Sequence, residues 1–85
     1  MFDMELKTDV ARLDAAIDEV SDPSESECEL LREHLESART YRLGAMPTEY
    51  AISLRLANEA LNCISNADRR RRVQEMIAAM LADEQ

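Results

Sequence analysis

The stretch that decides the fold is residues 47–64, which read PTEYAISLRLANEALNCI. On a helical wheel its apolar side chains cover an arc of roughly 200°. They are Ile52, Leu54, Leu56, Ala57, Ala60, Leu61, Cys63 and Ile64. An arc this wide predicts a helix that is buried against more than one neighbour, so we expect helix 47–64 to be the centre of the structure.

Two further helices are expected before this segment. Apolar residues from Leu6 to Val20 recur in steps of four and three, which is a heptad seam and predicts a helix over residues 4–20. Asp22 and Pro23 suit the N-cap and first position of a second helix over residues 23–43, with Glu25 completing a capping box. Gly44 is expected to end that helix in the left-handed conformation.

A fourth helix is expected after it, over residues 66–83, where Val73 and Ile77 begin an apolar stripe behind a Ser65 or Asn66 cap. The chain has 85 residues, with a single Gly and two Pro, which leaves little material for a sheet or a Gly-rich phosphate loop. We therefore predict one all-α domain over residues 1–85, a small up-and-down bundle of three to four helices.

Composition narrows the class of function. Eighteen acidic residues against ten Lys and Arg give a net charge of −8, which argues against sequence-independent binding to nucleic acid. No apolar run is long enough for a membrane span, and the start does not read as a secretory signal. We expect a cytoplasmic protein without membrane contact.

The cysteines and the histidine do not indicate a chemical site. Cys28 and Cys63 form no C-x-x-C pair and fall on apolar stripes, so in a reducing cytosol we expect two buried thiols rather than a disulfide. His34 is the only histidine and has acidic neighbours in sequence, which is typical of a surface residue. We therefore expect no metal, no cofactor, no catalytic residues and no enzyme activity.

The run Arg69-Arg70-Arg71-Arg72 is the hardest feature to explain by folding, because cations are disfavoured at the start of a helix. One interpretation is structural, with aliphatic stems over the core edge and guanidinium groups paired with Asp68, Glu75 or the acidic helices. The other is functional, a contact with a phosphate, a nucleic acid or an acidic partner surface.

Acidic residues concentrate in the first two predicted helices. Candidate partner-binding residues among them are Asp14, Asp18, Glu25, Glu29, Glu33 and Glu36. This face is interpreted as a docking surface for a basic protein, as a mimic of nucleic-acid phosphates of the kind found in phage anti-CRISPR or immunity-type inhibitors, or as a solvated surface.

From about Ser24 onward the chain resembles the YmgB/AriR family of small bacterial biofilm-development and two-component-system connector proteins. The resemblance rests on order and spacing: an acidic Ser24-Glu25-Ser26-Glu27 start, a break at Leu43-Gly44, an apolar helix with Ile52, Leu54, Leu56 and Leu61, then Ile64, Ala67-Asp68, a basic stretch, Glu75 and Ala82-Asp83. It implies a non-enzymatic helical homodimer that modulates signalling or gene expression. The family offers no sharp binding motif, so no site residues are carried over.

The thin core favours association as a source of stability. We expect a protein that acts by binding another protein, as a modulator or inhibitor of a signalling or gene-expression partner. The alternatives are a transcriptional regulator that binds nucleic acid through the Arg run and a nucleic-acid mimic. We also expect a homodimer, with interface candidates Leu13, Ile17, Ile52 and Leu56.

Overall fold

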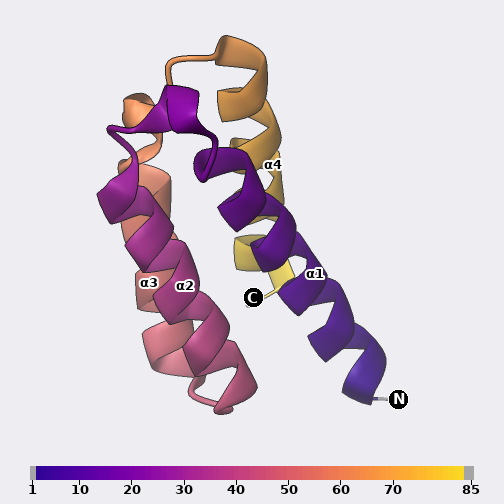
Figure 1. The fold of residues 1–85 in the computed structure, drawn as a ribbon. Helices are drawn as coiled ribbons and strands as arrows, with labels where there is room; N and C mark the ends of the chain where they lie inside the picture. The colour runs from indigo at the N-terminus through magenta and orange to yellow at the C-terminus, as the bar shows by residue number, and fades with distance from the viewer. Residues whose placement is uncertain (1, 84–85) are drawn as a thin grey trace.

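Four α-helices run alternately up and down (Figure 1). The computed structural model describes the backbone of residues 2–83 and the side chains of residues 6–83. The elements are α1 (Phe2–Val20), α2 (Glu29–Leu43), α3 (Pro47–Glu59) and α4 (Ala67–Asp83), with 3-10 turns η1 (Pro23–Glu25) and η2 (Leu61–Cys63). No strand occurs in this described part, so the predicted all-α bundle is confirmed. Met1, Glu84 and Gln85, which the single-domain prediction includes, lie outside the described residues.

The helices close on one another around a single core. Each packs on the next in sequence, α4 returns beside α1, and the α2–α3 contact is the most extensive. Buried side chains repeat every three or four residues: Leu13, Ala16 and Val20 on α1; Leu31, Leu35 and Ala38 on α2; Tyr50, Leu54 and Ala57 on α3; Val73, Ile77 and Met80 on α4. Within residues 2–83, no helix is both long enough and apolar enough to cross a membrane.

The heptad seam of α1 faces this core. Leu13 is 0% exposed, and Ile17 is half-buried against the same cluster. The prediction that Leu13 lies in a dimer interface is therefore wrong, and Ile17 is largely used within the chain as well. The reason is that α2 and α4 flank α1 on two sides, so four helices cover the seam without a second copy.

Cys28 and Cys63 form a disulfide, which corrects the prediction of two free thiols. Their Cα atoms lie 5.3 Å apart although the residues are separated by 35 positions. Cys28 directly precedes α2 and Cys63 ends η2, so the bond ties the start of one helix to the turn that follows α3. Sequence reasoning missed it because only the antiparallel pairing of α2 and α3 brings these two ends together.

Two predicted helices are shorter than expected. The second prediction, 23–43, splits into η1 and α2, because the Asp22 carboxylate accepts the Ser24 N–H at 2.9 Å and caps only a short 3-10 turn. The third prediction, 47–64, overshoots: α3 ends at Glu59 and η2 follows it. After α3 the apolar stripe continues because η2, with its buried Leu61, still packs on the core. Before α2 the buried residue of η1 is Glu25 rather than an apolar side chain.

The end of α2 corrects the prediction for Gly44. Gly44 has φ −85°, and the left-handed residue is Ala45 with φ 56°. The Met46 N–H donates to the Tyr41 carbonyl at 2.9 Å and the Ala45 N–H to the Arg42 carbonyl at 3.3 Å. This is the Schellman pattern with alanine in the position that favours glycine.

Candidate functional site

Two of the four consecutive arginines are held by internal ion pairs. Arg69 is 16% exposed and reaches three carboxylates: Nη1 lies 2.8 Å from Glu25, Nε 3.1 Å from Glu19 and Nη2 3.4 Å from Asp22. Arg72 Nε lies 2.6 Å from the other oxygen of Glu19. The structural interpretation of these two arginines is confirmed, because they join α4 to the end of α1 and to η1.

The other two arginines face outward. Arg70 donates from Nη1 to the Ile64 carbonyl at 3.2 Å, and Arg71 lies 3.5 Å from Asp68 with both side chains well exposed. An exposed pair at this distance contributes little to stability. Arg70 and Arg71 therefore form no ion pair that joins α4 to another described element, whereas Arg72 is paired with Glu19 although its side chain is about half exposed.

Glu25 is a closed structural site, although the sequence suggested a partner-binding residue. Its side chain is 0% exposed and accepts the Ser65 N–H at 2.8 Å, the Ser65 hydroxyl at 3.0 Å and the Asn66 N–H at 3.4 Å, in addition to Arg69. The Ser65 N–H is the main reason that the pKa of Glu25 falls to about 2. Glu25 thus caps the chain where it enters α4 instead of closing a capping box on its own turn.

The neighbouring carboxylates respond to the same contacts. The hydrogen bond from Arg72 lowers the pKa of Glu19, and the Ser24 hydroxyl and N–H lower the pKa of Asp22. Glu19 is shared by two guanidinium groups. We call Glu19, Asp22, Glu25, Arg69 and Arg72 the α4 junction.

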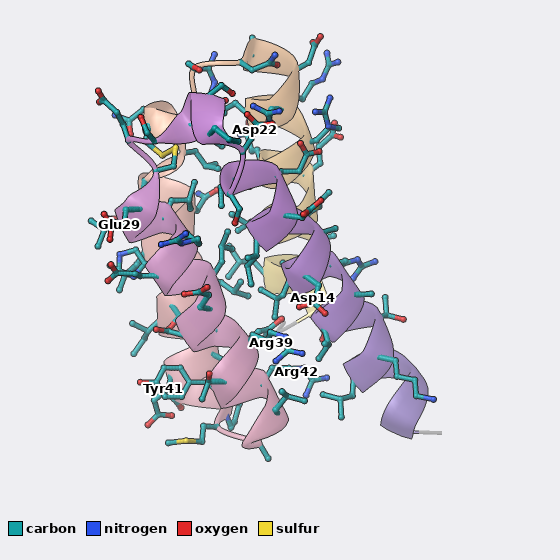
Figure 2. The ribbon with its side chains drawn as sticks, viewed as in Figure 1. Asp14, Asp22, Glu29, Arg39, Tyr41 and Arg42 are labelled. Atoms are coloured by element: carbon teal, nitrogen blue, oxygen red, sulfur yellow. A yellow bond between two sulfur atoms is a disulfide. The ribbon has the colours of Figure 1, made fainter. Side chains whose placement is uncertain are left out.

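A second set of ion pairs joins α1 to α2 near the middle and lower part of the bundle (Figure 2). Asp14 accepts from Arg39 Nε at 2.8 Å, and the buried Asp9 accepts from Arg42 Nε at 2.9 Å. Arg12 also lies 3.6 Å from Asp9. Asp14, a predicted docking residue, is therefore already neutralised by Arg39.

The remaining predicted acids are free of such partners. Asp18, Glu29, Glu33 and Glu36 are exposed, and none forms an ion pair with another described residue. Glu29, Glu33 and Glu36 follow one another at i, i+4 and i+7, which places them on one side of α2. These three carboxylates remain available to a partner.

A groove lies along the seam between α2 and α3 and was not predicted as a site. Its volume is about 410 Å³. Its apolar part is lined by Leu30, Leu31, Leu56, Ala60 and the disulfide residue Cys63, with His34, Asn62, Glu27 and Glu59 at its polar margin. We call these residues the α2–α3 groove.

Large apolar side chains are exposed at this groove. Leu30 is 60% exposed and Leu56 41%, and Ile52, one helical turn before Leu56, is 49% exposed. Ile52 and Leu56 were predicted as interface residues, and they do lie at the surface of the single chain. Leu30 was not predicted as an interface residue because it lies on the flank of its helix. A large apolar residue outside the core stripe of a helix is the sequence signal that could have identified it.

The groove is bordered by unpaired negative charge. Glu27 and Glu59 line it, while Glu33 and Glu36 line a separate hollow on α2 together with Tyr41. None of these four carboxylates forms an ion pair with any residue from 6 to 83. The surface therefore combines exposed apolar side chains with an uncompensated acidic margin.

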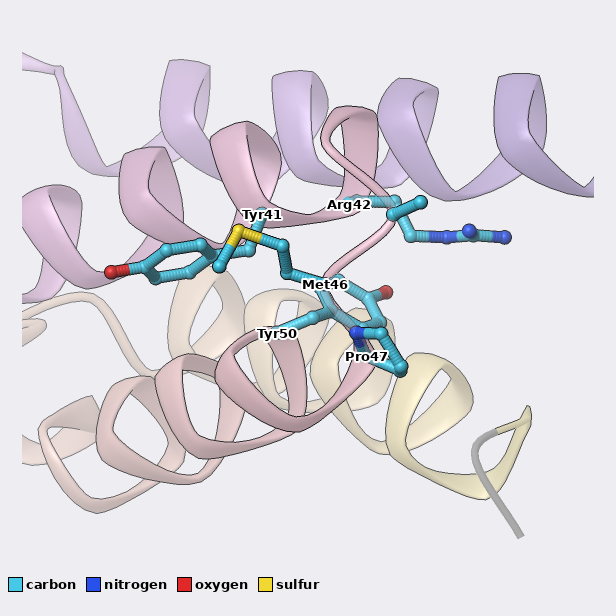
Figure 3. A pocket seen from close by; sticks show the side chains of 6 residues that line it. Tyr41, Arg42, Met46, Pro47 and Tyr50 are labelled. Carbon is cyan, nitrogen blue, oxygen red and sulfur yellow. The ribbon is translucent and has the colours of Figure 1, made fainter.

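A smaller pocket of about 270 Å³ lies at the α2–α3 loop. Figure 3 shows Tyr41 and Met46 at one side of it and Tyr50 and Pro47 at another, with Arg42 pointing away from Tyr41. The Arg42 guanidinium lies 5.8 Å from the centre of the Tyr50 ring and is bound to Asp9, which leaves the pocket largely apolar.

The described structure provides no candidate metal site. Within residues 2–83, no group of three or more His, Cys, Asp and Glu side chains is arranged to hold a metal ion. His34 is half-buried at the margin of the groove rather than on an open surface. The groove itself presents apolar surface together with carboxylate acceptors.

The chain was compared with protein-family models, curated proteins and solved structures. No protein-family model matches it, and neither a curated protein nor a solved structure is significantly similar to it.

Proposed function

We propose that this chain is a small non-enzymatic regulator that acts by binding another protein through the α2–α3 groove. The observation that carries the proposal is the coincidence of exposed Leu30 and Leu56 with carboxylates that have no internal partner. Apolar side chains surrounded by polar groups are typical of protein interaction sites. The resemblance to the YmgB/AriR family remains a prediction that is compatible with this role.

Affinity capture with two matched variants tests this function. Leu30→Gln/Leu56→Gln removes the apolar contact without changing charge or helix propensity. Leu43→Gln makes the same change at a side chain that is 52% exposed and lies outside the groove. A protein retained by the wild-type chain and by Leu43→Gln, and lost with the double variant, supports the proposal. Equal capture by all three chains contradicts it.

A homodimer formed through the same surface remains a second candidate. Of the four predicted interface residues, only Ile52 and Leu56 are exposed and support it. A two-fold interface would place the acidic margin of one copy against that of the other. Like charges brought together disfavour such a contact, so a partner of opposite charge fits the surface better.

The nucleic-acid-binding alternative is weakened because Arg69 and Arg72 are occupied within the chain. The nucleic-acid-mimic alternative is favoured by one observation, the unpaired row of Glu29, Glu33 and Glu36. It predicts that the protein competes with DNA or RNA for a basic host protein, and that replacing the row by Gln abolishes competition.

A cytoplasmic location was predicted because the start of the sequence does not read as a secretory signal. The Cys28–Cys63 disulfide favours an oxidising compartment instead, because such bonds persist mainly there.

A further inference from the structure

We propose that the natural occupant of the α2–α3 groove is a basic amphipathic helix of the partner protein. The inference rests on the proposed binding function and specifies the chemistry of the partner. Three properties of the groove carry it: its exposed apolar side chains, its acidic margin and its position between two antiparallel helices.

The exposed apolar side chains call for apolar anchors. Leu30 of α2 and Leu56 of α3 line the groove together with Ala60, which directly follows α3, and neither α1 nor α4 contributes to the lining. Covering the two exposed leucines removes apolar surface from water, which favours binding. A partner with Leu, Met or Phe at the contact gains this contribution.

The acidic margin of the groove favours a partner with cationic side chains. Glu27 and Glu59 lie on opposite sides of the groove, one before α2 and one at the end of α3. Arg39 and Arg42 are drawn into ion pairs with α1, but no cationic group of residues 6–83 lies within ion-pair distance of Glu27 or Glu59. Lys or Arg on both flanks of an apolar stripe complements this arrangement, whereas a second copy of the chain brings further carboxylates.

The shape calls for a helix. The groove runs between two antiparallel helices, and a third helix packs into such a seam by fitting its side-chain ridges between theirs. An extended segment binds to a sheet edge or, when it is proline-rich, to a groove lined by aromatic side chains. Residues 2–83 contain no strand, and no Phe, Tyr or Trp lines the groove. The helical walls of the groove run from Leu30 to His34 on α2 and from Leu56 to Glu59 on α3, about one helical turn on each side.

Designed peptides of about 15 residues test the chemistry directly. The first carries Leu at i, i+4, i+7 and i+11 with Lys at the flanking positions. The second is a scramble of the same composition, and the third has Glu in place of Lys. Fluorescence anisotropy measures the Kd of each for the wild-type chain, and circular dichroism checks that every variant keeps its helices.

We expect the first peptide to bind at least about 10-fold more tightly than the other two. Leu30→Gln/Leu56→Gln should weaken its binding by about 10-fold or more, while Leu43→Gln leaves the Kd unchanged. Glu27→Gln/Glu59→Gln should weaken binding several-fold and make it less sensitive to salt. Asp18→Asn/Glu75→Gln, which removes two exposed charges outside the groove, serves as the charge-matched control.

Equal affinity for the scramble or for the Glu peptide overturns the inference. So does an unchanged Kd in Leu30→Gln/Leu56→Gln. Sedimentation equilibrium provides another contrary outcome: a dimer that the double variant dissociates means that a second copy covers the groove. If capture of a protein depends on the groove and yet no peptide binds, the helical partner is wrong while the proposed function stands.

Discussion

The α4 junction and the α2–α3 groove use the same residue types in opposite ways. At the junction, Glu25 is buried and Arg69 satisfies it together with the Ser65 N–H. At the groove, Glu27 and Glu59 have no cationic partner among residues 6–83 and lie beside exposed leucines. The comparison teaches that a charged residue reports on function only after its internal partners are known.

The disulfide lies between the two regions. Cys28 is buried next to η1, and Cys63 is half-buried in the wall of the groove. The same bond therefore lies close to η1, which belongs to the α4 junction, and also forms part of the wall of the α2–α3 groove.

Removing the disulfide should have the largest effect. Closing a loop of 35 residues stabilises the chain by about 4 kcal/mol, because the unfolded state loses conformational freedom. We expect Cys28→Ala/Cys63→Ala to lower the melting temperature by about 20 °C. Calorimetry with and without reductant measures it, and a wild-type chain that melts at the same temperature in reductant would contradict the role of the bond.

Breaking the α4 junction should rank next. Arg69→Ala leaves the buried Glu25 carboxylate without its cation, which is costly in a site closed to water. We expect the melting temperature to fall by about 10 °C. Arg71→Ala, in the same run but exposed, should change it by less than about 2 °C. Equal decreases in melting temperature for the two variants would show that the ion pairs of Arg69 at the α4 junction contribute no more to stability than the exposed Arg71.

Acid should weaken the junction in a defined range. The pKa of Glu25 is about 2 in the folded chain against an ordinary value of 4.5, so its stabilising effect is complete above about pH 5. As the pH falls from there towards 2, the unfolded chain binds a proton that the folded chain does not, and stability declines. The lowered pKa values of Glu19 and Asp22 act in the same direction.

Chemical unfolding at a series of pH values measures this decline. Glu25→Gln should be less stable at neutral pH and show a shallower slope between about pH 5 and pH 2. A wild-type stability that is flat over this range would refute the assignment.

A smaller effect is expected at the α2–α3 loop, where alanine occupies a left-handed conformation. Ala45→Gly should relieve the steric cost of φ 56° and stabilise the chain by about 0.5–1 kcal/mol. Ala78→Gly, within α4, should destabilise by about 1 kcal/mol, because glycine is unfavourable inside a helix. Melting curves of the two variants should move in opposite directions, and a decrease for Ala45→Gly would contradict the expectation.

The smallest effect on stability is expected at the groove. Leu30→Gln/Leu56→Gln should change the free energy of unfolding by less than about 1 kcal/mol, because neither side chain belongs to the core. A loss comparable with that of Arg69→Ala would mean that these leucines serve the fold rather than a partner.

Local patterns in the sequence determined much of the architecture. The four helices, the up-and-down order and core positions such as Leu54 and Ile77 follow from periodicity and capping, which act within one or two helical turns. The α1 seam was also recognised, although the conclusion that it needed a second copy was wrong for Leu13. The wide apolar arc on residues 47–64 predicted burial against more than one neighbour, but Ile52 and Leu56 within this arc are exposed on the single chain.

Only the tertiary structure decided which distant groups meet. The Cys28–Cys63 bond and the Arg69–Glu25 pair join residues that are far apart in sequence. Their contact depends on where packing places the ends of α2, η2 and α4, and no local signal encodes that position. For the same reason the sequence could not divide its carboxylates into those that hold the bundle together and those that the folded chain leaves unpaired at the α2–α3 groove.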